Sequence, residues 1–72
     1  MHKFGAYTPK VIISALKKAG FQEIRTKGSH VQLRKENNLV TMPFHNKDLN
    51  ITTFKSILRQ SGLTMEELKK YL

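Results

Sequence analysis

Three short runs of alternating residues, joined by very short polar links, constrain the fold of this chain more than any other feature. The runs cover residues 21–26, 29–35 and 39–44, with Gly28 in the first link and Glu36-Asn37-Asn38 in the second. Strands joined by such short links pair antiparallel, because parallel neighbours need a crossover connection of a dozen or more residues. The sequence therefore predicts a three-stranded antiparallel meander.

Polarity alternates along the second run and indicates which face of the sheet is buried. Val31 and Leu33 point to one side of the strand, whereas His30, Gln32 and Arg34 point to the other. One side is thus apolar and needs to be covered, while the other can remain in contact with water.

The neighbouring runs extend this division to the whole sheet. Ile24 is expected on the apolar face and Arg25 on the polar one, and Val40 and Met42 are expected to flank an outward-facing Thr41. Helices should cover the apolar face. The open face is expected to carry Arg25, His30, Gln32, Arg34 and Thr41.

A first helix is expected before the three runs. Thr8 is a suitable N-cap, Pro9 suits the first helical position, and Gly20 can take the left-handed conformation just after the helix. Apolar residues at helical spacing lie between these signals, at Ile12, Ala15, Leu16 and Ala19.

Two further helices are expected after the runs. The first covers about residues 52–60 and ends at Gly62, and the second begins in a capping box over residues 64–67. Their apolar residues are Phe54, Ile57 and Leu58 in the first and Met65, Leu68 and Leu72 in the second.

The order of helix, three strands, helix and short helix predicts an α+β fold. Helices on one face of a three-stranded antiparallel sheet make a two-layer sandwich. The order α-β-β-β-α(-α) is that of double-stranded RNA-binding domains. The chain has 72 residues and no visible linker, so a single domain is expected over residues 1–72, with a loose start at residues 1–7.

The charge balance indicates a polyanionic partner. Thirteen lysine and arginine residues stand against five aspartate and glutamate residues, giving a net charge of +8. This excess favours nucleic acid or an anionic membrane surface. The sequence lacks cysteine, which excludes disulfides and thiolate metal sites, and it lacks a run of about 18 apolar residues that could span a membrane. A cytoplasmic location is expected.

Three histidines are candidates for proton transfer near neutral pH. His2 lies in the expected loose start, and His45 lies in a loop, where a capping role is the simpler interpretation. His30 lies on the polar face of the central run, where position alone favours an ordinary solvated histidine. Its basic neighbours favour a more specific interpretation.

RNA carries its own nucleophile, the 2′-hydroxyl group, so an enzyme that cleaves it needs a base, cations near the phosphate and an acid for the leaving oxygen. His30 can move a proton, and Arg25, Lys27 and Arg34 can stabilise the developing charge. This scheme requires no metal ion. The carboxylates that a metal-dependent nuclease would use are scattered along the chain, at Glu23, Glu36, Asp48, Glu66 and Glu67.

Aromatic residues do not favour the binding of single strands by base stacking. Phe21, Phe44 and Phe54 occupy positions that are expected in the core. The aromatic residues that could be free, none of which lies on the polar sheet face, are Phe4, Tyr7 and Tyr71.

Four segments form a specific combination. They are Leu16-Lys17-Lys18-Ala19-Gly20-Phe21, Lys27-Gly28-Ser29-His30, residues 43–49 and residues 56–63. In this order and spacing, between about residues 8 and 64, they resemble the HicA toxin family, the mRNA interferases of toxin–antitoxin systems. One departure is Thr52-Thr53, where family members usually have Gly-Thr.

The resemblance implies a double-stranded RNA-binding-like fold and cleavage of mRNA without a metal or another cofactor. It also implies neutralisation by a HicB-type antitoxin. The catalytic histidine of the family's Gly-Ser-His motif corresponds to His30, and an accessory role carries over to His45. The residues expected to bind RNA around them are Arg25, Lys27, Gly28, Ser29, Gln32, Arg34 and Lys47.

Two other interpretations stay open. The chain could be a binding module without catalysis that recognises double-stranded RNA through its phosphates and 2′-hydroxyls. It could also be a DNA-binding helix-turn-helix over residues 53–72, with the joint at residues 61–64. The second interpretation leaves the three strands unexplained.

Overall fold

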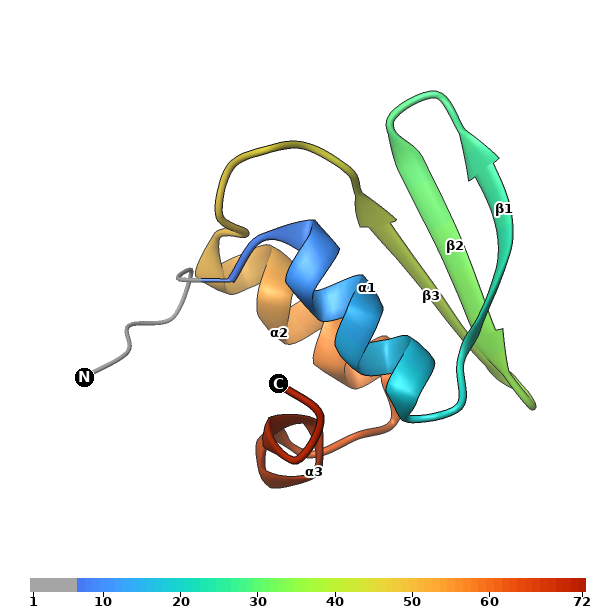
Figure 1. The fold of residues 1–72 in the computed structure, drawn as a ribbon, viewed down its shortest axis with the longest axis vertical. Helices are drawn as coiled ribbons and strands as arrows, with labels where there is room; N and C mark the ends of the chain where they lie inside the picture. The colour runs from blue at the N-terminus through green and yellow to red at the C-terminus, as the bar shows by residue number, and fades with distance from the viewer. Residues whose placement is uncertain (1–6) are drawn as a thin grey trace.

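The computed structural model of the chain describes residues 7–72 and has the predicted α+β architecture (Figure 1). The expected loose start therefore lies outside the described residues except for Tyr7, and so do His2 and Phe4. The elements in chain order are α1 (Pro9–Lys18), β1 (Gln22–Lys27), β2 (His30–Lys35), β3 (Asn38–Pro43), α2 (Ile51–Ser61) and α3 (Met65–Lys69).

The sheet is the predicted antiparallel meander, with strand order β1-β2-β3. β2 and β3 pair in register from His30–Pro43 to Lys35–Asn38. Val31 and Leu33 are buried on one face, as are Val40 and Met42 of β3 beside them, which confirms the alternation read from the sequence.

β1 departs from the prediction at Ile24. The pairing with β2 shifts between Glu23 and Arg25, so Ile24 is an extra residue in a β-bulge. Glu23 therefore lies opposite Leu33, on the face that strict alternation would give to Ile24 and not to Glu23. The expectation that Ile24 faces the core is wrong, because its side chain is 49% exposed.

Helix α1 begins and ends as predicted. The Thr8 hydroxyl accepts a hydrogen bond from the Val11 N–H, and Pro9 occupies the first helical position. At the other end Gly20 has a φ of 107°, and the Phe21 N–H donates to the Leu16 carbonyl at 2.9 Å. This is a Schellman ending, which turns the chain from the helix into β1.

Helix α2 starts one residue earlier than expected because Asn50 is its N-cap, with the side chain accepting from the Thr53 N–H at 2.8 Å. It ends at Gly62, where φ is 74°. The predicted capping box of α3 is present, since Thr64 and Glu67 bond reciprocally at 2.9 and 3.1 Å.

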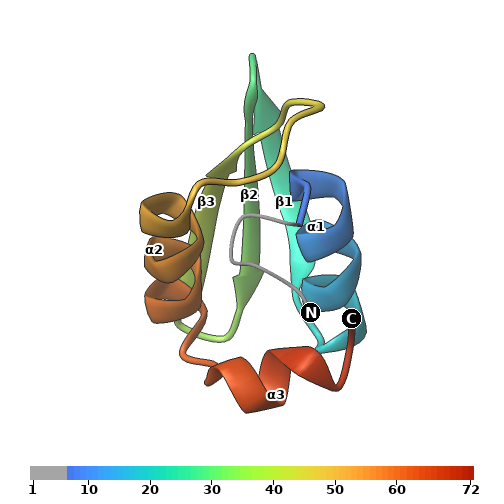
Figure 2. The same ribbon diagram turned by 90° about the vertical axis from the view of Figure 1, so that its left-hand side faces the viewer.

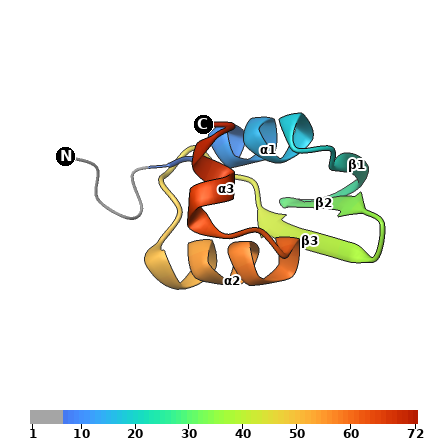
Figure 3. The same ribbon diagram turned by 90° about the horizontal axis from the view of Figure 1, so that it is seen from below.

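The helices form one layer and the sheet the other. Figure 2 shows α2 and α1 side by side on the same face of the sheet, and Figure 3 shows α3 lying across the space between them. The core between the layers includes Phe54, Ile12, Leu16, Leu33, Met42, Leu49, Ile57, Leu68 and Val40. The opposite face of the sheet has no helix over it among the described residues.

Four side chains lie differently from the prediction. Phe44 is 47% exposed and Leu72 is 42% exposed, so neither belongs to the core. Tyr7 packs on the core, with its ring 5.9 Å from that of Phe54, and its carbonyl accepts from the Leu49 N–H. Tyr71 is also partly buried against the core.

The short α3 does not fit the helix-turn-helix interpretation. It has five residues, and its first turn carries Glu66 and Glu67, which would repel a DNA backbone. Helix α2 packs on β3, so it belongs to the sandwich rather than to a separate two-helix unit.

Candidate functional site

Three rows of paired residues cross the open face of the sheet. The first row joins Lys27, His30 and Pro43. Because directly opposed residues in antiparallel strands point to the same side, these three side chains share the open face. His30 thus has a lysine on one side and a proline on the other.

The second row lies next to the first and joins Arg25, Gln32 and Thr41. Gln32 is partly buried, and its Nε2 lies 3.4 Å from Thr41 Oγ1. The contact with Thr41, on the neighbouring strand, restricts rotation of the Gln32 amide. It leaves the second N–H and the Oε1 atom of the amide without a partner from Thr41. Gln32 is therefore positioned beside His30, two residues along the same strand.

The third row contains Gln22, Arg34 and Leu39 and lies farther from the Gly28–Ser29 turn. Arg34 shares the open face as predicted. It is separated from His30 by the whole second row, so it lies at the other end of the face.

A concavity of about 630 Å³ covers the turn between β1 and β2 and the first two rows except for Pro43. Its lining contains two cationic side chains, one histidine, several neutral polar groups and no carboxylate. The lining residues are Arg25, Lys27, Gly28, Ser29, His30, Gln32 and Thr41. The expected open face and this concavity therefore coincide near His30.

The turn that closes the concavity depends on Gly28. Lys27 and His30 are the last pair of the β1–β2 ladder, so Gly28 and Ser29 form a two-residue turn. Gly28 has a φ of 57°, which disfavours other residues. The strand expected to begin at Ser29 begins at His30, and the Ser29 carbonyl accepts from the Phe44 N–H at 2.6 Å. Ser29 can therefore line the same concavity as His30.

Two residues that were predicted near the site lie elsewhere. His45 and Lys47 are in the connection between β3 and α2 and are absent from the lining of the concavity. The Nδ1 atom of His45 accepts a hydrogen bond from the Lys47 N–H at 3.2 Å, which is the loop-capping arrangement that its position suggested. Thr41, by contrast, lines the concavity although it was not among the expected RNA-binding residues. The sequence signal for this position was the alternation of Thr41 with the apolar Val40 and Met42, which predicted that Thr41 faces outward.

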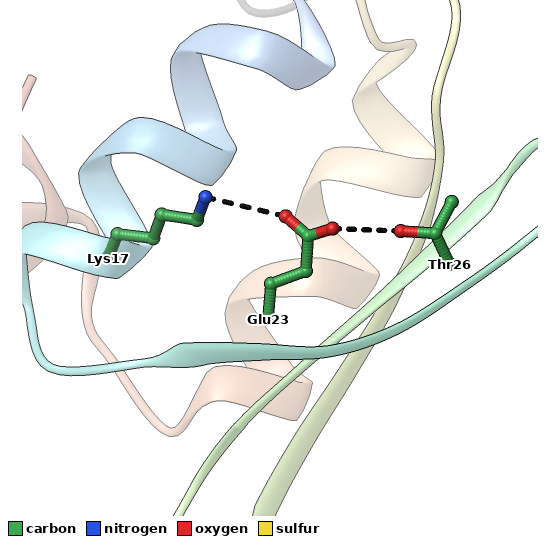
Figure 4. A network of polar contacts seen from close by, with 3 residues as sticks. All are labelled: Lys17, Glu23 and Thr26. Atoms are coloured by element: carbon green, nitrogen blue, oxygen red, sulfur yellow. Dashed lines mark hydrogen bonds and ion pairs between the residues drawn. The ribbon is translucent and has the colours of Figure 1, made fainter.

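The carboxylate of β1 is held away from the open face (Figure 4). Glu23 accepts a hydrogen bond from Thr26 Oγ1 at 2.8 Å and lies 3.4 Å from the Lys17 ammonium group of α1. The hydrogen bond from Thr26 and then the contacts with Lys17 lower the pKa of Glu23 below its ordinary value. The bulge that exposes Ile24 thus also keeps a negative charge off the side of β1 that carries Arg25.

A protein-family model, that of the HicA toxin of bacterial toxin–antitoxin systems, matches residues 10–63 of the chain. The chain belongs to the HicA toxin family. The match spans three quarters of the 72 residues and includes the whole lining of the concavity. No curated protein matches the sequence.

Membership of the HicA toxin family confirms the resemblance found in the sequence. The family supplies the toxins of bacterial toxin–antitoxin systems, so a cognate antitoxin is the partner that membership implies for this chain. The match ends within the residues that follow α2, so α3 lies outside it.

Two further properties of the described residues concern metal ions and membranes. Within residues 7–72, no three histidine, cysteine, aspartate or glutamate side chains lie close enough together to hold a metal ion. None of the helices in that part of the chain combines the length and apolar character needed to cross a bilayer.

Proposed function

We propose that this HicA-family toxin is an endoribonuclease that cleaves mRNA without a metal ion and thereby inhibits translation and growth. The observation that carries the proposal is the position of His30 in a basic concavity that contains no carboxylate. The cytoplasm is where such an enzyme would meet mRNA, and no small-molecule cofactor is needed.

The reaction uses the chemistry of RNA itself. His30 takes the proton of a 2′-hydroxyl group, whose oxygen then attacks the adjacent phosphorus, and the bond from phosphorus to the 5′-oxygen breaks. The products are a 2′,3′-cyclic phosphate and a free 5′-hydroxyl group. A histidine suits this step because it gains and loses a proton near neutral pH.

The other lining residues bind the substrate in this proposal. Arg25 presents a planar guanidinium group that can contact two phosphate oxygens at once and stabilise charge on them in the transition state. Gly28 and Ser29 let the backbone of the turn approach the RNA closely. Gln32 supplies both a donor and an acceptor to the nucleotide, whereas Arg34 and Lys47 would hold phosphates farther along the strand.

A HicB-type antitoxin is proposed to cover the open face with an acidic surface. The face is basic and uncovered, so an acidic partner would compete with RNA for the same cations. Replacing Arg34 by glutamate should then weaken both RNA binding and antitoxin binding. Full affinity for the antitoxin in that variant would place its binding surface elsewhere.

The proposed activity is tested by comparing wild type with His30→Ala on a purified mRNA transcript and on growth of cells that express each protein. Loss of the general base should slow cleavage by about 10²–10⁴-fold and relieve growth arrest. His45→Ala should have a smaller effect, since His45 lies outside the concavity. Lys55→Ala, on the outer surface of α2, is the matched surface control.

The alternative is a module that binds double-stranded RNA without cleaving it, which the α-β-β-β-α order and the basic sheet face also favour. The same experiment separates the two functions. Equal cleavage by wild type and His30→Ala would remove His30 from the mechanism. RNA binding with no product from wild type and no growth arrest would favour the binding module.

A further inference from the structure

The concavity provides an evident base, but the cleavage proposed above also needs an acid. The 5′-oxygen leaves as an alkoxide, which is a very strong base and departs much faster when it receives a proton. One histidine lines the concavity, and no carboxylate does. A second group must therefore supply the proton if the first one is occupied with the 2′-hydroxyl.

The lining offers few candidates for this role. Arg25 stays protonated in proteins and does not release its proton. The hydroxyl groups of Ser29 and Thr41 are very weak acids, and the Gln32 amide does not transfer protons at neutral pH. Lys27 carries an ammonium group, which can release a proton to an alkoxide because an alkoxide is a far stronger base than a lysine amine.

The register places Lys27 where such an acid is needed. Lys27 is paired directly with His30, at the end of the β1–β2 ladder next to the two-residue turn. Side chains of directly opposed residues start about 4.5–5.5 Å apart, and a lysine stem can extend past the imidazole to the far side of a phosphate bound between them. Attack in line with departure requires the base and the acid on opposite sides of the phosphorus.

The Lys27 ammonium group is also free to interact with a bound phosphate or leaving group, because no carboxylate pairs with it among the described residues. The described part of the chain holds no carboxylate within ion-pair distance of it, whereas Lys17 is paired with Glu23 and the ammonium group of Lys35 donates to the Ala19 carbonyl at 2.7 Å. Lys27 is exposed and lines the concavity. It is therefore a cation of the site with no structural role among its described contacts.

We propose that Lys27 is the general acid of the reaction, an inference that rests on the proposed ribonuclease function. As His30 removes the 2′-hydroxyl proton and the new bond from the 2′-oxygen to phosphorus forms, Lys27 donates a proton to the departing 5′-oxygen. The step leaves a protonated His30 and a neutral Lys27. Exchange with solvent then returns the proton lost by Lys27 and removes the one gained by His30.

The test uses two versions of one RNA oligonucleotide that contains a cleavage site mapped with wild-type protein on an mRNA transcript. One version has the natural 5′-oxygen at the scissile bond, and the other has sulfur in its place. A thiolate leaves without being protonated, so a missing acid does not slow the sulfur substrate. Lys27→Ala should cleave the oxygen substrate about 10²–10⁴-fold more slowly than wild type and should cleave the sulfur substrate at close to the wild-type rate.

Two variants serve as controls. Lys27→Arg keeps the positive charge but cannot release a proton. It should therefore bind RNA like wild type but cleave the oxygen substrate as slowly as Lys27→Ala does. Arg25→Ala should slow both substrates by the same factor, because it removes a phosphate contact. A circular dichroism spectrum shows whether each variant is folded.

The results separate this inference from the proposed function. An equal slowing of both substrates by Lys27→Ala would make Lys27 a phosphate-binding residue, and no slowing of either would remove it from the reaction. Each of these outcomes overturns the inference while the ribonuclease function stands. If wild type yields no product ending in a 2′,3′-cyclic phosphate, the proposed function itself fails, and the role of Lys27 fails with it.

Discussion

The side chain of Gln60 on α2 accepts a hydrogen bond from the backbone N–H of Thr41 on β3, with 2.9 Å between Oε1 and N. Thr41 lies on an edge strand, so without this acceptor its N–H would be unpaired on the outer side of the sheet. The Gln60 amide is held in turn by Ser56 Oγ at 3.0 Å. A helix in one layer thus fixes the strand that supports Gln32 on the open face.

Gln60→Ala should lower the free energy of unfolding by about 1–3 kcal/mol, since two intramolecular hydrogen bonds, one from the Thr41 N–H and one to Ser56 Oγ, are lost at a partly buried site. Urea denaturation monitored by circular dichroism measures the change. Gln60→Glu is the matched control, because its carboxylate retains an acceptor for the Thr41 N–H, and it should be less destabilising. Equal stability of Gln60→Ala and wild type would show that water replaces the side chain at no cost.

The β-bulge makes two apolar residues of the sheet very different in energetic importance. Leu33→Ala should cost about 2–5 kcal/mol, because the side chain is fully buried and leaves a cavity. Ile24→Ala should change stability by less than about 0.5 kcal/mol, because Ile24 is 49% exposed. Denaturation midpoints of both variants test this contrast. A large loss for Ile24→Ala would mean that the unshifted register, with Ile24 in the core, is populated.

RNA affinity should fall as salt concentration rises. Each phosphate contacted on a single strand contributes about −0.7 to the slope of the logarithm of affinity against the logarithm of salt concentration. Arg25→Ala should therefore make the slope shallower by about 0.7, provided that Arg25 contacts one phosphate. Fluorescence anisotropy of a labelled oligonucleotide gives the slope, with Lys55→Ala as the control on α2. A slope that is unchanged in Arg25→Ala would place the RNA on another surface.

Stability should decrease in acid through two surface carboxylates. One hydrogen bond from Thr26 and contacts with Lys17 lower the pKa of Glu23, and hydrogen bonds with Thr64 lower the pKa of Glu67, both from an ordinary value of 4.5. Because the folded state favours the charged form, this contribution is complete above pH 4.5 and is lost as the pH falls through the lower folded values.

Thermal unfolding at a series of pH values from 7 to about 3 measures this loss. Replacing Glu23 and Glu67 together by glutamine removes both titrations, so the double variant should lose less stability than wild type over the acid part of the range. An identical decline in both proteins would assign the acid sensitivity to other carboxylates. Both groups are exposed, so the difference is expected to be small.

Local signals in the sequence determined most of the fold. Thr8 and Pro9 begin α1, Gly20 ends it, and the capping box at Thr64 begins α3, because these contacts involve residues within a few positions of one another. The antiparallel meander followed from the short links. Alternation within β2 was enough to place His30 on the open face, since a strand without a bulge has a period of two.

Long-range packing decided the rest. The bulge at Ile24 shifted the register of β1 and so brought Glu23 into contact with Lys17 on α1, a pairing that no pattern within β1 contains. The side chain that bonds the N–H of Thr41 comes from Gln60, nineteen positions along the chain. The pairing of Lys27 with His30 also became visible only in the structure, where the two-residue turn lies at residues 28–29 and not at residues 27–28 as the sequence predicted. The residues of the site can be found by their chemistry in the sequence, but which of them meet depends on register and on the packing of distant elements.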